Sequence, residues 1–270
     1  MKIKHLLIIS TMIMTSSQIF AESVNLLTSQ DIKNPNSAMP KNFRDLSNLG
    51  INAIASAQFS EEQLKEVRKK YPNEKITIID LRRENHGFVN GEVVVWHSVF
   101  EKGNDRKSTA EILSEEKYLL KTAQKNGEIV INTVKKRDRE NGWYSEVEPK
   151  VVVVKRVSNE ENLAKENGFS YKRFSVRDFD MPDEKEFNKM VKFIKKLPKD
   201  QKLYVHCAGG KGRTDIIKNG KNVDLEEIFA RQNKLGAARL DEISEEEAWT
   251  KDLAQIRLKM LQDFYEKETD

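Results

Sequence analysis

The sequence predicts an α/β fold, in which buried strands alternate with amphipathic helices. Two short runs, residues 76–80 and 203–205, are rich in β-prone apolar side chains. Helical patterns with one apolar side begin near Ser60 and Pro182. Polar or glycine-rich residues follow each of the two strands at once. Because α/β folds bind ligands at the carboxyl ends of their strands, we expect a functional site there.

Composition and charge set broad limits. The chain has 270 residues, 33% charged and 38% hydrophobic, which suits one large soluble domain. The formal net charge of +4 predicts no particular partner, and we expect neither a nucleic-acid partner nor a stable membrane anchor. The single cysteine excludes an internal disulfide.

Residues 1–21 have the features of a signal peptide. A basic start with Lys2 and Lys4 precedes an apolar segment, residues 6–14, and a cleavage site ends at Ala21. The apolar segment is too short to span a bilayer. We therefore expect export, either to a periplasm or to the outside of the cell. A lone thiol in an exported protein favours a catalytic role.

The remaining residues, 22–270, are expected to form one domain with a small β-rich insertion at about 128–176. The mixed-charge run 135–140 inside it is typical of a solvated turn. The insertion is predicted from three β-prone runs, at 128–134, 151–157 and 171–176.

Capping motifs predict where two helices begin. Ser60 and Gln63 form a capping box at the start of the first. Ser108 or Thr109 caps the second, which is expected to run to Ala123 before an Asn-Gly stop signal.

A charged segment, residues 81–88, directly follows the strand at 76–80 and contains His86. Its place at a strand end is that of a ligand site. A solvated loop is the alternative interpretation. A further strand is expected at 93–96.

The stretch 202–220 is predicted to form a strand, a loop and a helix, with Cys207 where the strand ends. A helix N-terminus and a concave loop of backbone N–H groups together form an anion site. The loop glycines let these amides close around phosphate oxygens, and Arg213 adds a planar fork of donors. The thiolate is the nucleophilic form of cysteine, and Thr214 can donate its hydroxyl to the sulfur. A buried structural thiol would explain neither the glycines nor the arginine, so the pattern favours phosphoryl transfer through a cysteinyl-phosphate.

Such a reaction also needs a general acid that protonates the departing alkoxide. Asp178 and Asp180 lie upstream of Cys207, next to a proline that introduces a helix. Either can serve as the acid, and a surface carboxylate at a helix entry is the alternative for both.

Several segments together resemble the protein tyrosine phosphatase (PTP)-like phytases, also called cysteine phytases. The phosphatase loop alone indicates only the superfamily, whereas the segment 80–91 selects this family. In chain order the segments are PKNFR (40–44), SAQFS (56–60), DLRRENHGFVNG (80–91), RD (177–178), HCAGGKGRT (206–214) and ARQ (230–232).

The resemblance implies a PTP-like core, with a central sheet flanked by helices and a small partial β-barrel beside it. It implies no metal or other cofactor, and stepwise removal of phosphates from myo-inositol hexakisphosphate (phytate), a small polyanion. A polyanionic substrate would also explain the basic residues Arg82, Arg83, Lys172, Arg173 and Arg177.

Position within the family motifs implies a role for each site residue. Cys207 is the implied nucleophile, Asp178 the general acid and Arg213 the phosphate clamp. Thr214 is implied to assist hydrolysis of the phosphoenzyme. The other implied site residues are His206 beside the nucleophile, Ala208, Gly209, Gly210 and Gly212 in the loop, and Arg44, Asp80, His86 and Lys211 around the pocket.

The chain departs from the family pattern at two places. Phe179 stands where the family commonly has histidine, and the helix after Thr214 is about two turns shorter. A shorter helix weakens the dipole behind the anion loop and leaves a cavity in the core. We therefore expect either a poorly active or unstable variant, or a faulty gene version of an active phytase. A phosphatase of phosphotyrosyl proteins and a non-catalytic phosphate-binding module are the functional alternatives.

Overall fold

The computed structural model describes residues 27–30, 37–138, 140–178 and 182–210, together with short helical stretches between 251 and 262. The predicted signal peptide and the predicted helix after Thr214 lie outside the described residues. None of the helices within the described ranges combines the length and the apolar character needed to cross a membrane.

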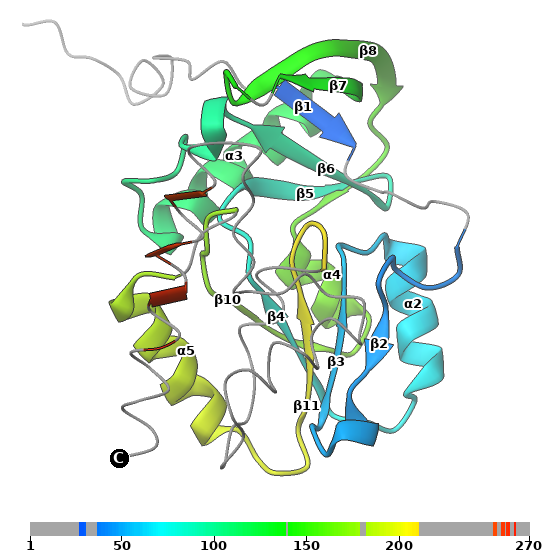
Figure 1. Ribbon diagram of the computed structural model, residues 1–270. Helices are drawn as coiled ribbons and strands as arrows, with labels where there is room; N and C mark the ends of the chain where they lie inside the picture. The colour runs from blue at the N-terminus through cyan, green and yellow to red at the C-terminus, as the bar shows by residue number, and fades with distance from the viewer. Residues whose placement is uncertain are drawn as a thin grey trace, which may run out of the picture.

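Five strands form a central sheet in the order β10-β4-β11-β3-β2 (Figure 1). Four of them run parallel, and β2 pairs antiparallel with β3 at one edge. The strands predicted at 76–80 and 203–205 are confirmed as β4 and β11, and the structure pairs them with each other. The bounds are Arg44–Asp45 (β2), Ala53–Ser56 (β3), Ile76–Asp80 (β4), Ser170–Arg173 (β10) and Lys202–His206 (β11).

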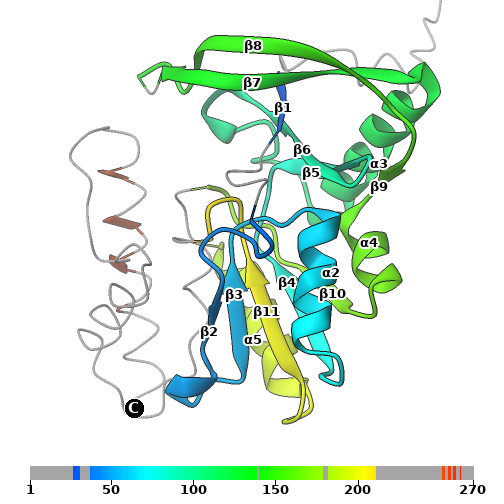
Figure 2. The same ribbon diagram turned by 90° about the vertical axis from the view of Figure 1, so that its right-hand side faces the viewer.

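Helices cover both faces of the central sheet (Figure 2). Side chains alternate along a strand, so Ile78 of β4 faces one side and Ile79 the other. Helices α2 (Glu61–Lys70) and α4 (Glu160–Glu166) pack on the Ile78 side, whereas α5 (Glu184–Lys196) packs on the Ile79 side. Short 3₁₀ turns occupy Ser47–Leu49 and Val99–Glu101.

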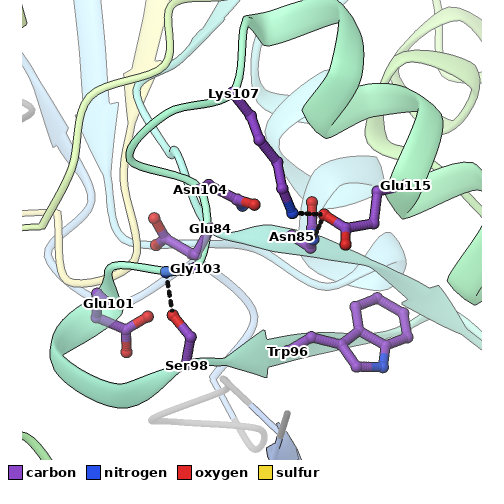
Figure 3. Close-up of a pocket in the computed structure, with 9 residues that line it drawn as sticks. All are labelled: Glu84, Asn85, Trp96, Ser98, Glu101, Gly103, Asn104, Lys107 and Glu115. Atoms are coloured by element: carbon purple, nitrogen blue, oxygen red, sulfur yellow. Dashed lines mark hydrogen bonds and ion pairs between the residues drawn. The ribbon is translucent and has the colours of Figure 1, made fainter. Parts of the chain in front are cut away.

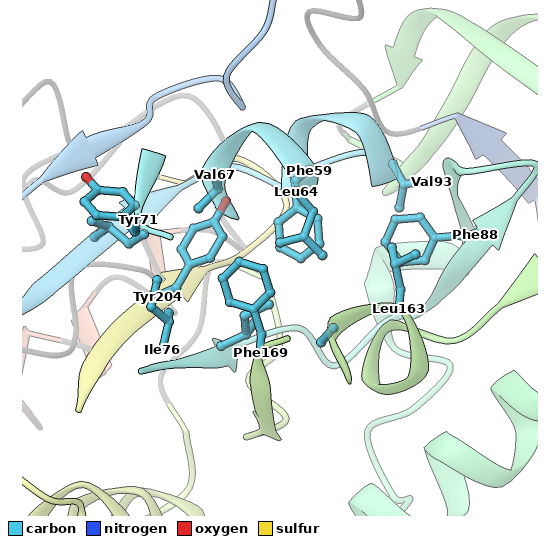
Figure 4. Close-up of a cluster of buried hydrophobic side chains, with 13 residues drawn as sticks. Phe59, Leu64, Val67, Tyr71, Ile76, Phe88, Val93, Leu163, Phe169 and Tyr204 are labelled. Carbon is cyan, nitrogen blue, oxygen red and sulfur yellow. The ribbon is translucent and has the colours of Figure 1, made fainter. Parts of the chain in front are cut away.

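Phe59 is completely buried in the cluster under α2 and α4 (Figure 4). Its ring centroid lies 6.3 Å from that of Phe88, 5.5 Å from that of Tyr204 and 5.0 Å from that of His206. Phe88 belongs to the second sheet, and His206 directly precedes Cys207. The same aromatic cluster therefore joins the two sheets and supports the strand that ends at the cysteine.

The second sheet has six strands in the order β8-β7-β1-β6-β5-β9. Helix α3 (Thr109–Asn126) packs against it through Leu120 and Ala123. Figure 2 shows the long β7–β8 hairpin across the end of the molecule away from the central sheet. The bounds are Leu27–Gln30 (β1), Asn85–Val89 (β5), Glu92–His97 (β6), Glu128–Asp138 (β7), Trp143–Val153 (β8) and Val157–Ser158 (β9).

The predicted helix caps are confirmed. The capping box at Ser60 and Gln63 is present at the start of α2. At the start of α3 the cap is Ser108, whose side chain accepts from the N–H of Glu111, and the helix ends at Gly127 with φ of 74°. These signals are local, which is why the sequence alone locates them.

One prediction for the second sheet is wrong. Residues 135–138 of the mixed-charge run continue β7, and the hairpin turn follows them. For the segment 81–88, the alternative of a solvated loop does not hold at residues 85–88, which belong to the fully buried strand β5. Its polar side chains are buried because they find charged partners, which propensity does not report.

The range predicted as an insertion divides between the two sheets. Strands β7, β8 and β9 join the second sheet, but β10 pairs with β4 in the central sheet. Pairing within the described residues follows a linear strand order, so a partial β-barrel stays a prediction.

Replacing Phe59 with alanine should lower the free energy of unfolding by about 3–5 kcal/mol, because the site is fully buried between two sheets. Val130→Thr, at a side chain that is 49% exposed on β7, should change it by less than about 0.5 kcal/mol. Urea unfolding followed by circular dichroism measures both. Equal effects of the two substitutions would contradict the assignment of this cluster as the core.

Candidate active site

Four parallel strands of the central sheet end side by side. The last residues of β3, β11, β4 and β10 are paired in register: Ser56 with His206, His206 with Asp80, and Asp80 with Arg173. Cys207 is the next residue after β11, so its thiol lies at this carboxyl edge. The sequence predicts a ligand site at the carboxyl ends of the strands, and Cys207 lies there.

In the described part of the cysteine loop, residues 207–210, the carbonyl oxygens of residues 208–210 accept hydrogen bonds from other segments of the chain. The backbone N–H of Gln58 donates to the carbonyl of Ala208 over 3.3 Å. The side-chain amide of Asn42 donates to the carbonyl of Gly209 over 2.8 Å. Nη1 of Arg44 donates to the carbonyl of Gly210 over 2.7 Å.

This arrangement fixes the direction of the loop amides. A trans peptide directs its N–H opposite to its C=O, and the described chain contains no cis peptide. With the carbonyls of Ala208 and Gly209 turned outward, the N–H groups of Gly209 and Gly210 are directed into the loop. The N–H of Gly210 donates to Sγ of Cys207 over 3.2 Å. The loop therefore has the beginning of an anion cradle around the sulfur.

Gly210 can adopt its conformation only as glycine. Its φ is +66°, and a Cβ there would lie 2.2 Å from the backbone nitrogen of Ala57 and 2.3 Å from the backbone carbon of Ser56. Backbone atoms of β3 cannot move aside as a flexible side chain would. Gly209 differs, because a Cβ there would meet no atom within 4 Å.

His206, the residue before Cys207, is held by a buried carboxylate. Its Nε2 lies 2.6 Å from Oε1 of Glu160, the first residue of α4. The other oxygen of Glu160 accepts from the side-chain amide of Gln58 over 2.9 Å and lies 3.1 Å from Nε2 of His86. Burial and the nearby carboxylate of Asp80 raise the pKa of Glu160, but the electrostatic attraction of His206 and the hydrogen bonds from His206 and His86 outweigh them and lower that pKa to about 2.

A second buried carboxylate, Asp80, lies beside this group. It accepts from the Tyr171 hydroxyl over 2.7 Å, and its Oδ2 is 3.2 Å from Nε of Arg173. Burial raises the pKa of Asp80, yet the guanidinium of Arg173 and the ring of His86 hold it well below the usual range. Arg173 also donates to Glu116 of α3 over 2.8 Å, so this ion-pair chain connects the central sheet to α3.

His86 lies between acceptors on both ring nitrogens. Nδ1 is 2.9 Å from the carbonyl of Glu84, and Nε2 faces the carboxylates of Glu160 and Asp80 at 3.1 Å and 3.4 Å. Nη2 of Arg173, which can only donate a hydrogen bond, also lies 3.3 Å from Nδ1. Burial and the guanidinium groups of Arg82 and Arg173 lower the pKa of His86. The carboxylate of Asp80 raises that pKa by more than they lower it, and the result is a pKa of about 9.

The structure places Asp80 and His86 beneath the site, with their side chains fully buried. Arg44 reaches the cysteine loop through a carbonyl and is 9% exposed. Direct binding of substrate by these three residues stays a prediction. Their observed contacts support the loop and the strand ends.

Internal acceptors bind four of the five basic residues that a polyanionic substrate was expected to explain, namely Arg82, Arg83, Arg173 and Arg177. Arg82 donates to Gln58 and pairs with Glu84, and Arg173 pairs with Asp80 and Glu116. Arg83 donates to the carbonyls of Asn104, Asp105 and Lys107. The structure thus assigns them to holding the loops of the site in place.

Asp178 follows β10 by five residues and is half-buried. Its neighbour Arg177 donates to the carbonyl of Phe100 over 3.0 Å, which ties the segment to the turn after β6. The alternative acid Asp180 lies outside the described residues. The same is true of Phe179 and of the implied site residues Lys211, Gly212, Arg213 and Thr214.

Asp80, His86 and Glu160 form the one group within the described ranges whose possible metal-ligand atoms lie within 4.8 Å of one another. Each already has charged or donor partners: Arg173 and Tyr171 at Asp80, His206 and Gln58 at Glu160. A cation there would have to displace these donors. The group therefore fits a paired-charge network better than a metal centre.

A small pocket lies between the start of β5, the end of β6 with the turn that follows it, and α3 (Figure 3). It is lined by carboxylates of Glu84, Glu101 and Glu115, and its lysine, Lys107, is already paired with Glu115 at 2.5 Å. An acidic lining repels a phosphorylated ligand. This pocket is thus not the phosphate site.

The sequence did not reveal the residues that hold the site from below. Glu160 and Glu116 have the sequence appearance of solvated helix carboxylates, yet both side chains are no more than 2% exposed. Asn42 and Gln58 lie inside family-like segments, but no role follows from their residue types alone. For Asn42 the available signal is its tolerance of left-handed backbone, which it adopts with φ of 56°.

Residues 79–218 match the family model of the PTP-like phytases, whose description is "Inositol hexakisphosphate". The chain belongs to this family. The match spans more than half of the sequence and includes the implied nucleophile, Cys207, and the implied acid, Asp178.

Solved structures agree with the PTP-like fold. The PTP-like myo-inositol phosphatase from Mitsuokella multacida, in complex with myo-inositol-(1,3,4,5)-tetrakisphosphate, is 31% identical, with a TM-score of 0.77 over 90% of this chain and 45% of that one. The tandemly repeated PTP-like phytase from the same organism is 26% identical, with a TM-score of 0.78 over 91% and 46%. A PTP-like phytase from Bdellovibrio bacteriovorus is 25% identical, with a TM-score of 0.72 over 90% and 88%.

Among curated proteins, the effector protein hopD2 of Pseudomonas syringae pv. tomato is 26% identical over 234 residues. That alignment covers 82% of this chain and 48% of the effector. The chain thus spans about half the length of this relative and of the Mitsuokella proteins.

Gly210→Ala should abolish binding of inorganic phosphate to the loop, since the added methyl group collides with the backbone of β3. Gly209→Ala is the matched control, because its methyl group meets open space. Isothermal titration with phosphate measures both, and circular dichroism checks the fold. Wild-type affinity in folded Gly210→Ala would disprove the close approach of the loop to β3.

The raised pKa of His86 predicts how stability depends on pH. A histidine whose folded pKa is about 9, against an ordinary value of 6.5, stabilises the fold fully below pH 6.5, and this stabilisation is lost as pH rises through 9. Glu160, with a folded pKa of about 2 against an ordinary value of 4.5, contributes its stabilisation in full above pH 4.5. It therefore causes no change in stability above pH 6.5. Urea unfolding at several pH values should therefore show a decline above pH 6.5.

His86→Gln should be less stable than the parent below pH 6.5 and should lose most of that decline. His97→Gln, in β6, should keep it because His86 remains in place. An unchanged decline in His86→Gln would assign the effect to other groups.

Proposed function

We propose that this chain is an exported phosphatase that removes phosphates stepwise from phytate through a cysteinyl-phosphate. The observation that carries the proposal is the loop at Cys207: its carbonyls are bonded outward, and the N–H of Gly210 is directed at the sulfur. A loop that turns amides toward a thiol suits a substrate with phosphate oxygens. Family membership and the inositol phosphate bound to the Mitsuokella structure support the substrate class.

The proposed reaction has two steps. The Cys207 thiolate attacks phosphorus, an S–P bond forms, and the ester P–O bond breaks while Asp178 protonates the departing alkoxide. Water then attacks phosphorus, Asp178 takes a proton from it, and the S–P bond breaks to release inorganic phosphate. Arg213 is proposed to bind two oxygens of the transferred group, and Thr214 to support the sulfur as it leaves.

Export is proposed from residues 1–21 alone, with their basic start and apolar segment. The destination is a periplasm or the outside of the cell. Fractionation of cells that express the full chain tests this part separately from catalysis.

The test of function is phosphate release from phytate by purified residues 22–270, with EDTA present. Cys207→Ser should reduce release to background, and Asp178→Asn should lower kcat by about 10²–10⁴-fold. Asp200→Asn is the control, since this exposed carboxylate pairs with Lys75 far along the sheet and should leave kcat unchanged.

Other outcomes would replace the proposal. Faster turnover of a phosphotyrosine peptide than of phytate would favour a protein phosphatase. Phytate binding without release, by a folded protein, would favour a non-catalytic binding module. No release together with an unfolded spectrum would assign the loss to the shortened helix after Thr214.

A further inference from the structure

Glu160 is a buried carboxylate that takes no part in the reaction proposed above. It is the first residue of α4, and its side chain is 1% exposed. The N-cap Asn159 and the buried Leu163 and Ala164 fix this end of the helix against the central sheet. Its carboxylate is thus held on a rigid element and directed toward the strand ends.

The two oxygens of Glu160 hold the chain on both sides of Cys207. Oε1 accepts from Nε2 of His206, the residue before the cysteine, over 2.6 Å. Oε2 accepts from the side chain of Gln58, whose backbone N–H donates to the carbonyl of Ala208, the residue after the cysteine. The nucleophile therefore lies between two residues that one carboxylate positions, directly on one side and through Gln58 on the other.

Among the described residues, Glu160 is the one hydrogen-bond partner of the His206 imidazole. The ring is completely buried, and within the described ranges its Nδ1 has no hydrogen-bond partner. The remaining ring contacts are aromatic, with Phe59 and Tyr204. Without an acceptor at Nε2, neither the tautomer nor the ring orientation is fixed by a hydrogen bond.

Glu160 also connects the cysteine strand to the segment that selects the family. Its Oε2 lies 3.1 Å from Nε2 of His86, and His86 in turn lies 3.4 Å from Asp80. Both residues belong to segment 80–91. The charged groups around Glu160 thus come from β4, β5 and β11, with Arg82 and Arg173 close by.

We propose that Glu160 is a positioning residue for the nucleophile, which holds His206 and Gln58 so that Cys207 and its loop are preorganised for phosphate. The inference rests on the proposed function, because it assigns the support of that same site. It adds a residue that acts through others and touches no substrate. Preorganised sites lose rate when their supporting residues are loosened, even where the fold survives.

Glu160→Gln tests this with little change in volume. Every partner of the carboxylate is a donor, so the NH₂ of the introduced amide must oppose either His206 or the Gln58 and His86 pair. We expect kcat for phytate to fall 10- to 100-fold, with KM changed less than threefold. Glu161→Gln is the matched control: it removes the same charge from the next residue of α4, which is exposed and paired only with Lys165 among described contacts. It should keep wild-type kcat.

A spectroscopic readout separates positioning from general support. In ¹⁵N-histidine-labelled protein, the ring-nitrogen shifts of His206 should report hydrogen on Nε2 in the parent and a changed pattern in Glu160→Gln. The chain has four histidines, so assignment by single substitution is direct. Wild-type kcat and unchanged His206 shifts in folded Glu160→Gln would overturn the proposal.

Two provisions keep the test decisive. If Glu160→Gln does not fold, Glu160→Asp keeps the charge and shortens the reach, and it should lower kcat at least threefold; wild-type kcat would overturn the proposal.

If the parent releases no phosphate, the proposed function fails, but affinity for inorganic phosphate still tests positioning. That affinity should weaken at least fivefold in Glu160→Gln and stay unchanged in Glu161→Gln, and equal affinities would refute it.

Discussion

The pairing of buried charges where the two sheets meet is the constraint on which this structure depends. Asp80, His86, Glu160 and Arg173 are nearly or fully inaccessible to solvent. An unpaired charge at such depth costs several kcal/mol, so each group must have its partner in place before the interface can close. The geometry of the strand ends is therefore specified by directional contacts as well as by apolar packing. That precision suits a site which must hold a sulfur and several amides at fixed distances.

The cysteine loop gains its shape from residues far away in the chain. Asn42 and Arg44 lie more than 160 positions before the carbonyls they bind. Gln58 adds a third contact from the end of β3. Because parallel strands of one sheet bring these segments together, the topology and the site are not separable. A change of register in β3 or β11 would misplace every one of these donors.

Local signals were sufficient for much of the fold. Caps at Ser60 and Ser108, and the apolar strands β4 and β11, could be predicted because their causes lie within a few residues. The position of Cys207 at a strand end followed in the same way. Strand β5 and the role of Glu160 could not be predicted, because a polar side chain is buried or solvated according to partners that lie 30 to 102 residues away in the sequence.

The contacts around the loop also bear on the short helix that the sequence predicts after Thr214, outside the described residues. In the usual arrangement of such sites, a helix dipole and its N-terminal amides stabilise the bound anion. Here the amides of Gly209 and Gly210 are directed by carbonyl bonds to Asn42 and Gln58, which precede Cys207 in the chain. These contacts come from residues outside the predicted helix. We therefore expect a helix as short as the sequence predicts to weaken the electrostatic stabilisation of the anion while these contacts still direct the two amides, and so to lower the rate more than the affinity for phosphate.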